Sequence, residues 1–132
     1  MKVDHVGIAV KSLEAAIKAY EGLGLRMTST DTVAGEGVKV AFLPVGESRI
    51  ELLESLTPNG VIAKFIEKRG EGVHHIALQV DDIDEAIARA KANGLQMINE
   101  TPRTGAHGRK VAFVHPKSTS GVLLEFVQVQ HE

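Results

Sequence analysis

The second half of this chain of 132 residues repeats the first half. Residues 3–27 align without a gap onto residues 73–97, at a constant offset of 70. Under this offset His5 meets His75 and Gly24 meets Gly94. A shared alternation of apolar residues would not also keep histidine on histidine and glycine on glycine. We therefore interpret the pattern as an internal duplication, which predicts two copies of one structural module.

The repeat continues beyond this segment with small shifts of register. Residues 39–42 match residues 110–113 at an offset of 71, and residues 50–52 match residues 124–126 at an offset of 74. The last match places Glu51 on Glu125. The additional residues fall in turn-like segments, where insertions are tolerated.

Each half predicts one strand, one helix and three further strands. Ser12 and Asp82 are at N-cap positions of a helix in each half. An additional helix at about 61–68 follows the first set. The strands are predicted at 2–10, 25–29, 38–44 and 48–53, and at 73–80, 95–99, 110–115 and 122–128.

These elements predict an α+β fold of two tandem βαβββ modules in a single domain, 1–132. Module one covers about 1–56, a segment with the linking helix covers about 57–70, and module two covers about 71–132. A four-stranded half cannot bury its apolar face alone. We therefore expect the modules to form a curved sheet around a shared cleft.

Composition excludes several classes of protein. Fifteen Lys and Arg against seventeen Asp and Glu give a net charge of −2, which argues against a nucleic-acid partner. No apolar run approaches the ~18 residues of a membrane span. The absence of Cys excludes a disulfide framework and thiolate metal sites. The chain begins without the apolar stretch of a secretory signal, so we expect a cytoplasmic protein.

Four ionisable residues within apolar strands form two repeat-related pairs: His5 with His75, and Glu51 with Glu125. A buried glutamate is costly unless it is paired or bound to a metal. Taken singly, each residue could be a hydrogen-bonded core residue or lie on a solvated face. As a symmetric set of two imidazoles and two carboxylates, they predict a site for a divalent cation such as Co²⁺, Mn²⁺, Ni²⁺, Fe²⁺ or Zn²⁺.

Two loops of the second half give weaker signals. Residues 101–108 form a Gly-punctuated loop with His107, which could fold over a ligand, although an ordinary hairpin connection explains it equally well. Residues 115–118 could meet phosphate groups through Lys117, although a plain turn is the simpler interpretation.

Several motifs resemble a known family nearly end to end. They are Asp4-His5-Val6-Gly7-Ile8-Ala9-Val10, Gly72-Val73-His74-His75, His115-Pro116-Lys117 and Gly121-Val122-Leu123-Leu124-Glu125. Through these motifs the chain resembles the vicinal oxygen chelate superfamily, which has the fold predicted above. Within that superfamily, the double His, the His-Pro-Lys segment and the last motif are similar to the methylmalonyl-CoA epimerase family.

The resemblance implies interconversion of (R)- and (S)-methylmalonyl-CoA in propionyl-CoA metabolism, by a homodimer. It implies metal ligands at His5, Glu51, His75 and Glu125, with Co²⁺ favoured. One position departs from the pattern. Some members carry Gln at the position of Glu51 and a Glu, proposed as a base, at the position of Val40. That base is absent here.

Epimerisation removes a proton from one face of a carbon and delivers a proton to the other face, and a cation stabilises the enolate formed in between. Our hypothesis is that Glu51 and Glu125 serve both as ligands and as the two proton carriers. Three alternatives use related scaffolds: a glyoxalase I-type lactoylglutathione lyase, a ring-cleaving dioxygenase and a metal-free small-molecule binding protein. A dioxygenase would use two His and one carboxylate with open positions, so a fourth ligand argues against it.

Overall fold

The computed structural model describes residues 1–129, and its backbone contacts divide into two compact units. The first-repeat unit is His5–His74. The second-repeat unit contains Met1–Asp4 and the chain from His75 onward. The first residues of the chain therefore group with the second repeat, which sequence comparison alone did not indicate. The last three residues of the predicted second module, 130–132, lie outside the described part.

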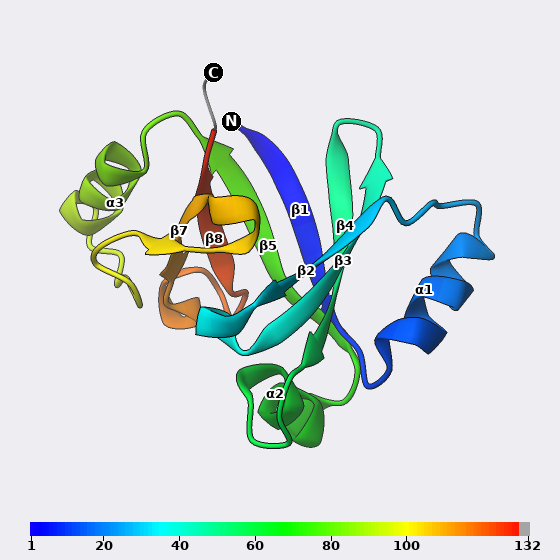
Figure 1. The fold of residues 1–132 in the computed structure, drawn as a ribbon. Coiled ribbons are helices and arrows are strands. Elements are labelled where there is room, and N and C mark those ends of the chain that lie inside the picture. Colours follow the sequence, from blue (N-terminus) through cyan, green and yellow to red (C-terminus); the bar gives the residue numbers. More distant parts are fainter. Residues whose placement is uncertain (130–132) are drawn as a thin grey trace. The chain divides into compact units, whose positions relative to one another are not determined.

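The first-repeat unit has the predicted order of elements. They are β1 (Lys2–Ala9), which starts in the other unit, α1 (Leu13–Glu21), β2 (Ser29–Val33), the short 3₁₀ helix η1 (Ala34–Glu36), β3 (Val38–Val45), β4 (Ser48–Ser55) and α2 (Val61–Arg69). The strand order is β2-β3-β4-β1, with β4 antiparallel to β3 and parallel to β1. Helix α1 packs against β3 and β4, and α2 packs against β4 (Figure 1).

The second-repeat unit repeats the series of one strand, one helix and three strands. Its elements are β5 (Gly72–Val80), α3 (Ile83–Ala92), β6 (Arg103–Thr104), η2 (Ala106–Gly108), β7 (Lys110–Val114), η3 (Pro116–Ser118) and β8 (Leu124–Gln128). The strand order is β5-β8-β7-β6, and β8 is again parallel to one neighbour and antiparallel to the other. Helix α3 packs against β7 and β8 (Figure 1).

The two units also share the way in which each helix begins. In the first, the Glu54 carboxylate at the end of β4 accepts a hydrogen bond from the Leu13 backbone N–H at 2.6 Å. In the second, the side-chain carbonyl of Gln128 at the end of β8 accepts one from the Ile83 N–H at 3.0 Å. The first N–H groups of a helix have no partner within the helix. The last strand of each repeat therefore fixes the start of that repeat's helix.

Apolar side chains on one face of each helix form the two main cores. In the first-repeat unit, Leu13 packs with buried residues of β3 and β4, including Leu43 and Leu52. In the second, Ile83 and Ile87 pack with residues of β7 and with Met97. The helical period predicted from the sequence therefore directs the apolar face of each helix against its own sheet.

Two strands lie later in the chain than predicted. The predictions at 25–29 and 95–99 were wrong in position, since β2 begins at Ser29 and β6 at Arg103. Leu25 and Met27 pack against the core of α1, and Met97 is buried and forms only an isolated bridge with Val114. Their apolar alternation reflects packing against a helix, whereas the sheet pairing starts in the more polar residues that follow.

The remaining elements agree with the predictions to within about two residues at each end. The predicted helix at 61–68 corresponds to α2, Val61–Arg69. Within residues 1–129, no helix has the length and apolar character needed to cross a membrane.

The N-cap of α3 gives a first testable prediction. The Asp82 carboxylate accepts a hydrogen bond from the Glu85 N–H at 3.2 Å. We expect Asp82→Ala to lower the free energy of unfolding by about 1 kcal/mol, as is typical for the loss of a helix cap. Asp81→Ala, at the exposed neighbour of the cap, is the matched control for urea denaturation. Equal effects of the two substitutions would contradict the capping role.

Candidate functional site

Each unit buries one imidazole beside one carboxylate. In the first-repeat unit, His5 Nδ1 lies 3.1 Å from Glu51 Oε2, and the two side chains are 6% and 5% exposed. In the second-repeat unit, His75 Nε2 lies 3.3 Å from Glu125 Oε1, with exposures of 7% and 8%. Each unit therefore brings together the one histidine and the one glutamate that its copy of the repeat supplies.

Strand register explains why the same pair forms twice. Glu51 lies beside Gly7 on the parallel strand, and Glu125 lies beside Ala77. In each unit the histidine precedes that neighbour by two residues, so it is on the same face of its strand. The antiparallel neighbour strand also has the same register in both units. Each glutamate is opposite a phenylalanine, Phe42 for Glu51 and Phe113 for Glu125.

These donors fit a divalent metal ion. A neutral imidazole nitrogen and an ionised carboxylate are ligands for borderline cations such as Co²⁺ and Zn²⁺. Within each pair the candidate ligand atoms are already close, and both groups are shielded from water. An ion would compensate the desolvation of a carboxylate that burial otherwise makes costly.

Arg49 distinguishes the first pair from the second and was not predicted from the sequence. Its Nε and Nη2 donate to Glu51 Oε2 at 3.2 and 2.9 Å, and its guanidinium lies 5.8 Å from the centre of the Phe42 ring. The repeat-equivalent position holds Leu123, and His75 instead packs edge-on against Phe113 at 5.6 Å. The missed signal was an arginine two residues before the glutamate, on the same face of a strand.

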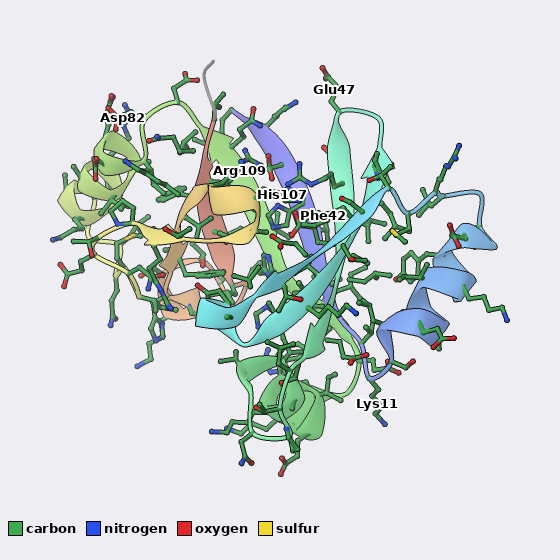
Figure 2. All side chains as sticks on the ribbon, viewed as in Figure 1. Lys11, Phe42, Glu47, Asp82, His107 and Arg109 are labelled. Carbon is green, nitrogen blue, oxygen red and sulfur yellow. The ribbon has the colours of Figure 1, made fainter. Side chains whose placement is uncertain are left out.

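The two weaker candidates lie on exposed turns at opposite ends of β7. His107 is on η2 and has a left-handed backbone, with φ of 57° (Figure 2). Lys117 is on η3, where its backbone N–H donates to His115 Nδ1 at 3.1 Å. The two residues lie on separate turns, so each stays a separate prediction.

Val40 and His74 both pack against other side chains of the first-repeat unit. Val40, where some family members carry a Glu, is an apolar core residue of β3 and cannot carry a proton. His74, the neighbour of His75, packs edge-on against Phe65 with ring centres 5.0 Å apart. Its ring is therefore part of the packing against α2.

The sequence matches the model of the glyoxalase/bleomycin resistance protein/dioxygenase superfamily over residues 4–113. The chain therefore belongs to this superfamily, and the predicted fold class is confirmed. It is 40% identical over 131 residues to an ethylmalonyl-CoA/methylmalonyl-CoA epimerase of Cereibacter sphaeroides, a match that covers 97% of this chain and 98% of the relative.

Two solved structures are also similar to this chain over most of their length. A variant of the Streptomyces coelicolor methylmalonyl-CoA epimerase in complex with 2-nitronate-propionyl-CoA has a TM-score of 0.93 and 34% identity, covering 97% of this chain and 94% of that chain. A hypothetical protein of Bacillus halodurans has a TM-score of 0.97 and 51% identity, covering 99% and 96%. The similarity thus extends over nearly the whole chain.

The Arg49–Glu51 interaction can be tested without substrate. We expect Arg49→Met to lower the free energy of unfolding by about 1–3 kcal/mol, because it removes charge-assisted hydrogen bonds from a buried carboxylate. The loss should shrink in a Glu51→Gln background, where the acceptor is neutral. Arg26→Met, at an exposed arginine, is the control in urea denaturation. A loss that is the same with Glu or Gln at position 51 would contradict this interaction.

Proposed function

We propose that this chain interconverts the two epimers of methylmalonyl-CoA. The observation that carries the proposal is the repeated His–Glu pair, buried in the same register in both units. It occurs in a chain that is 40% identical to an ethylmalonyl-CoA/methylmalonyl-CoA epimerase over nearly its full length. A metal-free binding protein would have no reason to bury two such pairs.

We propose that both pairs hold one divalent cation, with His5, Glu51, His75 and Glu125 as its ligands. Co²⁺ is the favoured ion, and Mn²⁺, Ni²⁺ and Zn²⁺ suit the same donors. When bound, such an ion supplies Lewis-acid stabilisation of the negative charge that develops on the thioester oxygen. The support for the ligand set is the burial of each pair and the chemistry of its donors.

The carboxylates would also carry the protons. The hydrogen at C2 lies between a thioester and a carboxylate, and inversion requires its removal on one face and redelivery on the other. Glu51 and Glu125 come from different copies of the repeat, so we assign one to each face, as base and acid in alternation. The contact with Arg49 makes the surroundings of the two carboxylates unequal. This difference would decide which carboxylate is the base for which epimer.

The substrate's CoA portion carries phosphates, which cationic and imidazole side chains can bind. We propose His107 and Lys117 as substrate contacts, since both lie on exposed turns of the second-repeat unit. We further propose that the enzyme acts as a homodimer in the cytoplasm, in propionyl-CoA metabolism. Common dimerisation in the superfamily supports the first of these points, and the absence of Cys is compatible with the second.

Removal of the metal provides a direct test. We expect a chelator to abolish interconversion of (R)- and (S)-methylmalonyl-CoA, and Co²⁺ to restore it, because stabilisation of the developing charge would be lost and regained. The glutathione adduct of methylglyoxal is the control substrate. Turnover of that adduct in preference to methylmalonyl-CoA would instead identify a glyoxalase I-type lactoylglutathione lyase.

Deuterium uptake at C2 in heavy water tests the two carboxylates. We expect Glu51→Gln and Glu125→Gln each to lower the rate of epimerisation by at least about 10²-fold, as is typical for the loss of a general acid or base. If one carboxylate acts on each face, each variant should still exchange the C2 hydrogen of one epimer faster than that of the other. Normal exchange in both variants, with metal retained, would contradict the scheme.

A further inference from the structure

A buried polar cluster in the second-repeat unit is not used by the reaction proposed above. Asp4 is 3% exposed, and its carboxylate accepts hydrogen bonds from Arg109 Nη1, at 3.0 Å to Oδ1 and 3.1 Å to Oδ2. Gln79 Nε2 donates to the same Oδ1 at 3.1 Å. Arg109 also reaches the backbone carbonyl of Gln128, from Nη2 at 3.4 Å. The guanidinium thus joins the start of β1 to the end of β8.

Duplication does not account for this cluster. The residue equivalent to Arg109 in the first repeat is Val38, a core residue that is 8% exposed. The equivalents of Asp4 and Gln79 are His74 and Ala9. An apolar side chain therefore suffices to start β3, whereas the corresponding strand β7 is preceded by a buried ion pair. Burying two charges costs desolvation energy that apolar packing does not cost. The ion pair is therefore weak evidence for added stability, and we looked for another role.

The arginine lies at the base of the turn that carries His107. Figure 2 shows both residues on the segment leading into β7. The turn is closed by hydrogen bonds from the Gly105 N–H to the Arg109 carbonyl at 2.8 Å and from the Arg109 N–H to the Ala106 carbonyl at 3.3 Å. His107 has φ of 57° and Gly108 has φ of 69°. A left-handed conformation at a residue other than glycine persists only when its surroundings hold it.

We propose that Arg109 is a positioning residue for substrate binding, which acts through its ion pair with Asp4 to hold the turn that presents His107. The inference rests on the proposed function, because it takes His107 as a substrate contact. Both oxygens of the buried Asp4 carboxylate accept from Arg109 Nη1, while Nη2 reaches the Gln128 carbonyl, so the two nitrogens of one guanidinium hold two separate acceptors. Since Asp4 directly precedes His5 in the chain, the same ion pair restricts the backbone beside a proposed metal ligand.

Hydrogen exchange of the substrate-free, full-length protein tests whether Arg109 holds the turn. We expect Arg109→Met to raise exchange in the peptide that covers residues 103–110 by about tenfold or more, with little change in α1 and β3. Arg109→Lys keeps the charge but has one nitrogen in place of the two that reach Asp4 and the Gln128 carbonyl, so its effect should be intermediate. Arg89→Met is the matched control, because Arg89 pairs with Glu85 on the exposed face of α3.

Kinetics of the metal-loaded enzyme tests the link to the substrate. We expect Arg109→Met to raise KM for methylmalonyl-CoA by about tenfold and to change kcat by less than about twofold. Adding His107→Ala to this variant should cost much less than His107→Ala costs in the wild-type background, since both act through one turn.

The outcomes separate the two claims. Unchanged exchange in residues 103–110, or an increase spread over all strands, would overturn the positioning role, and so would additive effects of the two substitutions. A wild-type enzyme without epimerase activity would overturn the proposed function, and the exchange measurement would then still decide whether Arg109 holds the turn.

Discussion

Each repeat buries a carboxylate next to an imidazole, and the candidate site is built on this contact. A glutamate on a strand within the core loses its hydration and needs compensation from a hydrogen bond, a cation or both. In each unit the parallel neighbour strand brings a histidine to within about 3 Å of the glutamate. The register of three strands therefore determines the chemistry of the site.

Duplication explains the symmetric part of the molecule, and later substitutions explain its differences. The shared features are the order of elements, the register around each glutamate and the side chain from the last strand that fixes the start of each helix. Two arginines are among the differences. Arg49 contacts Glu51 where Leu123 stands in the other copy, and Arg109 contacts Asp4 where the other copy has Val38.

Much of the fold and of the site follows from the sequence, because both depend on periodicity and on the repeat. The histidine and glutamate of each pair were predicted because identical polar residues recur in apolar strands. The start of β2 and of β6 was not predictable from alternation, since Leu25 and Met97 alternate like strand residues but pack against helices. The contacts of Arg49 and Arg109 depend on which residues the register makes neighbours, which no local pattern reveals.

The central claim, that two copies of one His–Glu pair serve a single cation, is tested most directly by X-ray absorption of the protein loaded with Co²⁺. A shared site predicts one cobalt per chain, coordinated by two imidazoles and by carboxylate oxygens, and the loss of one imidazole from the spectrum in either His5→Ala or His75→Ala. Two cobalt ions per chain with one imidazole each, or a spectrum that neither substitution changes, would contradict it.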